Sequence, residues 1–317
     1  MVTQALNLVE LFKKWGVNQG RPIFILGHDQ CDVDSFLSGK LLERLGRHFG
    51  LAIRFICLDS QMDEETTRIV RQLGFKVEEV YATEDDRQVL KSNADVILVD
   101  HYQTKRVALE QVVMCIDHHP TQELPTYAYY QNEVCSACAA LIYRAISTVP
   151  ELDTMEVKQW VATAIMVDTC SLKSSKTQPA ERKLIQAWSE QQVIDFNQLY
   201  KVGLCLTDLS QSTEVLIQHG LKHYQYVGEK VCSSYIQVDR ELSAWQKRQF
   251  VAEIQNEMQE SSIAMWVFLI VNVHHQKTIE YRITTRTFQE QGYGFICSRG
   301  QHIMPAIEKM FLAKYQH

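Results

Sequence analysis

The chain has 317 residues, 46% of them hydrophobic, and a formal net charge of -6 at pH 7. This length favours two buried cores over one, and the acidic balance argues against nucleic acid as a partner. The longest apolar run, residues 263–271, is too short to cross a bilayer, so we expect no membrane span. Residues 1–16 have the pattern of an amphipathic helix without the features of a secretory signal, which predicts a cytoplasmic protein.

The first two thirds of the chain alternate strand and helix patterns. A helical pattern follows the first strand, and Ser35 is its predicted N-cap. The alternation predicts an α/β fold with a doubly wound parallel sheet, in a domain that covers residues 1–205. Runs rich in Val, Ile, Leu and Phe predict its strands near residues 22–27, 51–58, 76–81, 94–100 and 112–117.

From about residue 213 the order of the elements changes. The pattern predicts a smaller mixed α/β domain over residues 213–317, joined to the first by a polar segment. Its strands are expected at residues 231–238, 263–273 and 278–285, and its helices at residues 241–258 and 305–314.

Acidic and imidazole side chains gather where elements of the first domain should end. Three segments follow predicted strands, at residues 27–35, 99–103 and 116–120, and a fourth at residues 167–177 closes a helical pattern. The carboxyl ends of parallel strands meet at one edge of the sheet, where ligands bind. The candidate metal ligands are His28, Asp32, Asp34, Asp100, His118 and Asp168.

This set of donors indicates a particular chemistry. Carboxylates and imidazoles suit manganese, cobalt or magnesium better than a thiolate-loving ion. Two ions held about 3.5 to 4 Å apart clamp the attacking and leaving oxygens of a phosphoryl transfer. A single aspartate after a strand is more often a cap or a solvated loop residue, but four such segments in one chain favour a metal site. The residues therefore predict metal-assisted hydrolysis of a phosphate ester or anhydride.

The motifs resemble those of a known family. The GHxxxDxDS loop, the VDH segment and the triplet Asp117-His118-His119 are similar to the DHH phosphoesterase superfamily, above all to manganese-dependent (type II) inorganic pyrophosphatases. Residues 161–177 and 295–311 resemble further segments of that family, so the resemblance covers most of the chain.

The resemblance implies a mechanism and a set of roles. Two or more Mn2+ ions, with Co2+ or Mg2+ as alternatives, would activate a hydroxide that attacks diphosphate. Because the ligands fall in the first domain and Lys222 and Arg299 in the second, we expect a small phosphorylated substrate to be enclosed on closure. A homodimer through the first domain is also implied. The implied catalytic residues are His119, Asp100 and Asp168, and the implied substrate-binding residues are His119, Lys173, Lys222 and Arg299.

Departures from the family pattern leave the substrate open. Cys31 stands where the pyrophosphatases usually have proline, and Gly300 stands where they have a lysine. Both changes favour an alternative: an exopolyphosphatase, or another DHH-type phosphoesterase that acts on short polyphosphate or a nucleotide-derived phosphate. A catalytically inactive regulatory protein is disfavoured because all six ligands and His119 are present.

The nine cysteines do not form a disulfide or zinc pattern. Cys135 and Cys138 make a single CxxC without a second pair, and the others are scattered. We therefore expect buried free thiols.

Overall fold

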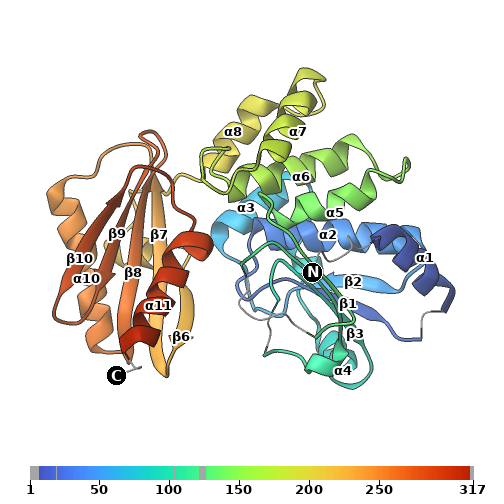
Figure 1. The fold of residues 1–317 in the computed structure, drawn as a ribbon, viewed down its shortest axis with the longest axis horizontal. Helices are drawn as coiled ribbons and strands as arrows, with labels where there is room; N and C mark the ends of the chain where they lie inside the picture. Colours follow the sequence, from blue (N-terminus) through green and yellow to red (C-terminus); the bar gives the residue numbers. More distant parts are fainter. Residues whose placement is uncertain (1–6, 19, 103–104, 121–125, 315–317) are drawn as a thin grey trace. The chain divides into compact units, whose positions relative to one another are not determined.

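The computed structural model describes residues 7–18, 20–102, 105–120 and 126–314. The first six residues of the predicted N-terminal helix and Gln103 lie outside these ranges. The chain divides into two compact units (Figure 1). The first consists of Met1–Leu172 and Lys176–Gly203, and the second of Lys173–Ser175 and Leu204–His317. The short segment that carries Lys173 thus belongs to the second unit.

The first unit contains a five-stranded sheet in which every neighbouring pair is parallel. The order β2-β1-β3-β4-β5 places the first strand inside the sheet. This arrangement confirms the predicted α/β fold with a parallel sheet. The strands are β1 (Ile23–Leu26), β2 (Ile53–Ile56), β3 (Asp95–Val99), β4 (Val112–Asp117) and β5 (Tyr129–Asn132).

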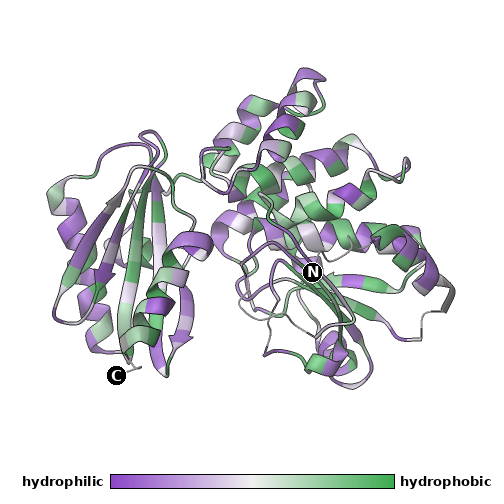
Figure 2. Ribbon diagram, viewed as in Figure 1, coloured by the Kyte–Doolittle hydropathy of each residue, from purple (hydrophilic) through white to green (hydrophobic). Residues whose placement is uncertain are grey.

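Helices cover both faces of this sheet. Helix α2 (Val33–His48) contacts β1, β2 and β3, and Gly39 gives the ring of Phe55 room against it. On the opposite face, Leu90 of α4 (Glu84–Ser92) packs against Phe24 and Leu98. Figure 2 shows the hydrophobic strands between these layers. The other helices of the unit are α1 (Leu8–Asn18), α3 (Glu64–Gln72), α5 (Cys138–Ile146), α6 (Met155–Asp168), α7 (Pro179–Glu190) and α8 (Phe196–Leu204), with 3-10 turns at Val77–Glu79 and Leu109–Gln111.

Two local predictions for this unit are wrong. Residues 76–81 do not form a strand but a 3-10 turn over Val77–Glu79. The buried residues Val77 and Val80 are three apart, which is the spacing of a helical turn and not the alternation of a strand. The N-cap of α2 is Asp32 and not Ser35, because the Asp32 side chain accepts the backbone N–H of Ser35 at 3.1 Å. Strand β5 was not predicted, since its residues form no apolar run.

The second unit has a mixed sheet in the order β10-β9-β8-β7-β6. Strands β7 and β8 are parallel and the other pairs are antiparallel. Phe250 and Ile254 of α10 pack on one face, and Ile307 and Phe311 of α11 pack on the other. The elements are β6 (Lys222–Tyr226), β7 (Glu229–Val238), β8 (Ile263–Asn272), β9 (Lys277–Ile283), β10 (Phe288–Tyr293), α9 (Thr213–Gln218), α10 (Ala244–Gln259) and α11 (Met304–Lys314), with a π-helical turn at Arg299–Ile303.

The predicted central strands and long helices of this unit are present, but its two edge strands were missed. Residues of β10 are almost all exposed and those of β6 alternate between exposed and half-buried. An edge strand with little buried surface leaves a weak hydrophobic pattern. Across the described part of the chain, no helix is long and apolar enough to cross a membrane.

Candidate metal centre

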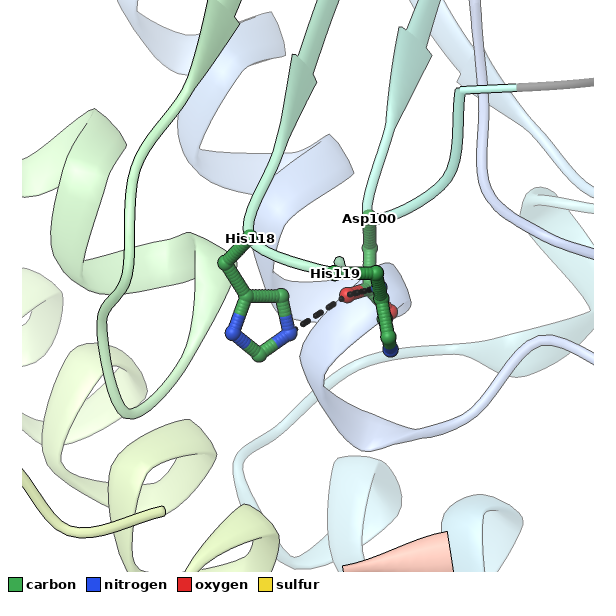
Figure 3. A group of neighbouring side chains, drawn as sticks. All are labelled: Asp100, His118 and His119. Atoms are coloured by element: carbon green, nitrogen blue, oxygen red, sulfur yellow. Dashed lines mark ion pairs between the residues drawn. The ribbon is translucent and has the colours of Figure 1, made fainter. Parts of the chain in front are cut away.

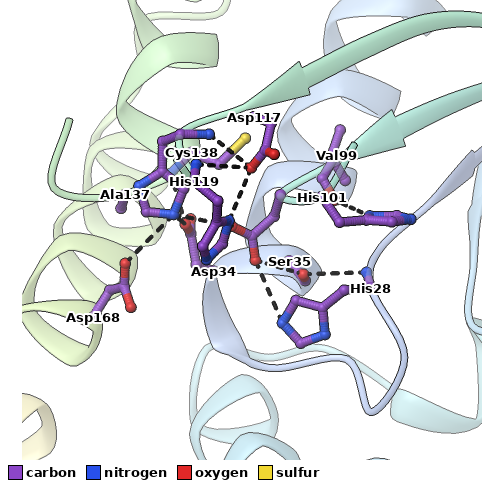
Figure 4. A network of polar contacts seen from close by, with 12 residues as sticks. His28, Asp34, Ser35, Val99, His101, Asp117, His119, Ala137, Cys138 and Asp168 are labelled. Carbon is purple, nitrogen blue, oxygen red and sulfur yellow. Dashed lines mark hydrogen bonds and ion pairs between the residues drawn. The ribbon is translucent and has the colours of Figure 1, made fainter. Parts of the chain in front are cut away.

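The acidic and imidazole groups of the first unit meet at the carboxyl edge of its sheet. His28 lies just beyond β1, Asp100 directly follows β3, and His118 directly follows β4. Asp34 lies in the first turn of α2, and Asp168 is the last residue of α6. Figure 4 shows His28, Asp34 and Asp168 around this edge, each from a different element. Parallel strands with short connections to their helices therefore bring distant segments to one place.

Asp100 lies at the centre of the cluster. Its Oδ2 accepts the hydroxyl of Ser35 at 2.7 Å and lies 3.6 Å from His28 Nε2. Its Oδ1 lies 3.1 Å from His118 Nε2 (Figure 3). The backbone of Asp100 has a φ of 63°, a left-handed conformation that is uncommon outside glycine and concentrated at functional sites. The side chain is 2% exposed, so its charge depends on these partners.

His118 and His119 have different surroundings. The Nδ1 of His118 faces the Cys135 carbonyl at 3.1 Å, which leaves Nε2 pointing at the carboxylates. The Nδ1 of His119 faces Asp117 Oδ1 at 2.9 Å, and its side chain is 33% exposed against 1% for His118. His118 is thus placed as a ligand inside the cluster. His119 is oriented by Asp117 and reaches the surface.

Burial and hydrogen bonds set the protonation of the central pair. Burial opposes the charged form of His118, but its hydrogen bond to Asp100 outweighs this and raises the pKa of His118 well above its ordinary value. Burial also favours a neutral Asp100, yet the hydrogen bond from His118 and the charges of His119 and His118 hold the pKa of Asp100 well below its ordinary value. Each of the two groups therefore favours the charged form of the other.

Asp34 is held by the first turn of α5. Its Oδ2 accepts the backbone N–H of Cys138 at 2.6 Å, and its Oδ1 accepts the N–H of Ala139 at 3.0 Å and the hydroxyl of Ser38 at 3.2 Å. Burial and the charge of Asp100 raise the pKa of Asp34 to about 8. The CxxC motif thus contributes its backbone to the centre, and all nine cysteines are free and buried, as predicted.

Asp168 closes the cluster and carries a partner that the sequence reasoning did not include. Its Oδ2 lies 3.7 Å from His118 Nε2 and also accepts a hydrogen bond from the ammonium group of Lys176. Lys176 is only 7% exposed. Burial disfavours its charge, but the charge of Asp168 and its hydrogen bond outweigh burial, so the pKa of Lys176 lies above its ordinary value.

The described residues offer three overlapping groups of donor atoms, each within 4.8 Å. All six predicted ligands are among them, together with His119. Asp100 Oδ1 is fully buried and faces His118 Nε2 at 3.1 Å, so these two atoms are placed side by side as candidate ligand atoms. The donors are oxygen and imidazole nitrogen, which fit Mn2+, Co2+ or Mg2+. The groups are Asp100 with His118 and His119, His28 with Asp32 and Asp100, and Asp34 with His118 and Asp168.

The three cations predicted to bind phosphate all belong to the second unit. Lys222 pairs with Ser233 across β6 and β7, and the guanidinium of Arg299 donates to the Ser233 carbonyl at 3.3 Å and to Gly220. Lys173 instead donates to the carbonyl of Val273 at 3.0 Å. Ser233 aligns with Val267, so the carbonyls bound by Arg299 and Lys173 lie roughly 20 Å apart along the strands. Lys222 and Arg299 thus meet the same residue of β7, and Lys173 binds a carbonyl further along the sheet.

Sequence reasoning missed several residues that support the centre. Ser35 was predicted as a cap but binds Asp100, and Lys176 was passed over in favour of Lys173. Arg106 also supports the loop that carries His28, since it donates to the Gly27 carbonyl at 2.7 Å and pairs with Asp29 at 2.7 Å. A lysine or arginine in a polar loop has no periodic signal, so only the fold identifies these contacts.

Comparison with known proteins identifies the domain that carries this cluster. Residues 22–171 match the family described as "DHH family, N-terminal domain", so this segment is a DHH-family domain and the predicted resemblance is confirmed. Curated relatives include a probable manganese-dependent inorganic pyrophosphatase of Lactobacillus acidophilus, 22% identical over 79% of this chain and 81% of the relative. A protein of the same description from Lactobacillus helveticus is 23% identical over the same shares.

Two solved structures share the fold. A putative family II inorganic pyrophosphatase of Methanococcus jannaschii superposes with a TM-score of 0.69 at 17% identity, covering 92% of this chain and 99% of that one. An exopolyphosphatase-related protein from Bacteroides fragilis gives a TM-score of 0.52 at 14% identity, covering 98% and 96%. At these identities the likeness concerns the fold. Domain, fold and donor cluster together support a metal-dependent phosphoesterase.

Proposed function

We propose that this chain hydrolyses inorganic pyrophosphate to two phosphates with the help of two divalent metal ions, Mn2+ foremost. The single observation that carries the proposal is the convergence of six oxygen and imidazole donors, from five elements, into overlapping groups at the carboxyl edge of the sheet. The relatives described as manganese-dependent pyrophosphatases support the choice of ion and substrate.

Some of these residues would hold the metal ions and others would bind the substrate. Bound ions would supply Lewis-acid activation of a water and charge neutralisation of the phosphates. Asp100 and His118 take part in two donor groups each, so each would contribute to more than one ion position. The Nδ1 of His119 faces Asp117, so Nε2 of this half-exposed ring is available to hydrogen-bond a phosphate oxygen or protonate the leaving group.

Lys222 and Arg299 of the second unit would bind phosphate oxygens. Both are anchored around Ser233, and the Arg299 guanidinium also stacks over the ring of Tyr235 at 5.2 Å. Arginine presents a planar fork of donors that matches phosphate oxygens, while lysine contributes a point charge. Lys173 remains a third candidate, although its ammonium is bound to a carbonyl.

A second candidate substrate is a longer phosphate chain. Gly300 is exposed in the turn that begins at Arg299, so no side-chain charge stands beside the guanidinium there. A site with one cation fewer neutralises pyrophosphate less completely and leaves room for a longer or esterified phosphate.

Phosphate release separates these substrates. Purified protein with Mn2+ would be assayed on pyrophosphate, tripolyphosphate, long-chain polyphosphate and nucleoside triphosphates, with Asp100→Asn as the control. Turnover of pyrophosphate that is lost in Asp100→Asn supports the first proposal, and preference for the longer chains selects the second. If no phosphate is released from any of these substrates, both proposals are contradicted. The homodimer and the cytoplasmic location stay predictions, and sedimentation equilibrium tests the first of them.

A further inference from the structure

A lysine side chain already supplies a positive charge to the donor cluster. The ammonium of Lys176 donates to Asp168 Oδ2, the same oxygen that lies 3.7 Å from His118 Nε2. Asp100 and Asp34 also attract this ammonium. One buried cation therefore stands among three of the six candidate ligands.

The backbone around Lys176 is held in place. The N–H of Gln178, two residues further on, donates to the Ser136 hydroxyl at 2.9 Å, and that hydroxyl in turn donates to Glu181. Helix α7 begins directly afterwards at Pro179, whose ring favours the first turn of a helix. The lysine thus extends into the cluster from a fixed point, with 7% of its surface exposed.

This charge affects the donor groups unequally. Lys176 is bound to Asp168, which belongs to the group Asp34, His118 and Asp168. A divalent ion in that group would face a positive charge on its own ligand, and like charges repel strongly in a buried site. In the group of His28, Asp32 and Asp100, Asp100 also attracts the ammonium, but the hydrogen bond of Lys176 is to Asp168 of the other group.

We propose that Lys176 is a resident cation of the metal centre that weakens ion binding at Asp34, His118 and Asp168 and leaves His28, Asp32 and Asp100 as the tight site. The two ion positions then differ in affinity. The second ion binds fully only when the Lys176 ammonium leaves Asp168, which frees it to face an anionic substrate. This inference rests on the proposed function, because it assumes that the cluster holds metal ions.

Metal titration of the metal-free protein tests the inference without using activity. Mn2+ binding would be measured by calorimetry and by the EPR signal of free Mn2+, in wild type and in Lys176→Met, which keeps the length of the side chain without its charge. Lys176→Gln is a second charge-free variant in case the first does not fold. Lys183→Met is the matched control, because Lys183 is exposed on α7 of the same unit.

We expect a tight and a weak site in wild type, with the weak site at least about tenfold tighter in both Lys176 variants and the tight site unchanged. The control should match wild type. Mn2+ should also raise the melting temperature more in Lys176→Met than in wild type, since the metal-free variant lacks the internal cation. Unchanged or weaker binding at the second site in both variants would overturn the inference and leave the proposed function standing. Absence of Mn2+ binding in wild type and all variants would overturn the proposed function as well.

Discussion

Replacing Ser35 with alanine tests whether the hydroxyl behind Asp100 holds this carboxylate for the metal. Ser35 is fully buried, and its hydroxyl donates to Asp100 Oδ2 at 2.7 Å. Among the described residues the next group near that oxygen is His28 Nε2, at 3.6 Å. The variant removes one oxygen atom and keeps the Cβ that packs against Gly27. Its effect should therefore report on the hydrogen bonds of this hydroxyl, the short one donated to Asp100 and a longer one accepted from the His28 backbone N–H at 3.5 Å.

The expected size follows from the charge of the acceptor. A hydrogen bond to a charged group contributes about 1.5 to 3 kcal/mol, and 1.36 kcal/mol corresponds to a factor of about ten. Residues that orient a metal ligand typically change metal affinity by about 10- to 100-fold. We expect Ser35→Ala to weaken Mn2+ binding within that range. The variant should lose Mn2+ affinity more than folding stability, because the packing around residue 35 is kept.

Ser38 provides the matched control, one turn further along α2. It is also fully buried and donates to Asp34 Oδ1 at 3.2 Å, but Asp34 keeps the backbone N–H groups of Cys138 and Ala139. Ser38→Ala should therefore weaken Mn2+ binding by less than about threefold. Calorimetric titration of both variants measures the difference. Equal effects, or a change below threefold in Ser35→Ala, would refute this account of Asp100.

Three further predictions concern the roles assigned to individual residues. His118→Gln should abolish tight Mn2+ binding, whereas His119→Gln should keep it and lose turnover; the reverse result would exchange their roles. Mn2+ affinity should rise as pH increases from 6 to 8. The pKa of Asp34 is raised to about 8 and that of His118 is also raised, and both groups must lose a proton to bind the ion. Calorimetry in buffers of different ionisation enthalpy counts the released protons, and an affinity that does not change with pH contradicts the prediction. Arg299→Lys should raise KM for pyrophosphate about tenfold without changing Mn2+ affinity, because lysine keeps the charge and loses the planar fork; an unchanged KM argues against phosphate binding by Arg299.

The accuracy of the sequence prediction varied with burial. Strands β1, β3 and β4 lie inside the parallel sheet and are buried on both faces, so they are continuous apolar runs that the sequence displays directly. Edge strands such as β5 and β10 bury less surface and were not predicted. A strand was predicted at residues 76–81 where the chain forms a 3-10 turn, because a helical turn with two buried valines has the composition of a short strand.

The sequence by itself indicated the DHH-family domain, the parallel sheet and the candidate donors. His28, Asp100 and His118 follow buried strands, and residues in such positions emerge at the edge where parallel strands end. Only the tertiary structure decided which side chains support those donors. Ser35 reaches Asp100 across 65 positions of the chain. Lys176 contacts Asp168 within the first unit, whereas Lys173 binds the carbonyl of Val273 within the second. Contacts between distant polar residues depend on the path of the backbone, and no local periodicity records that path.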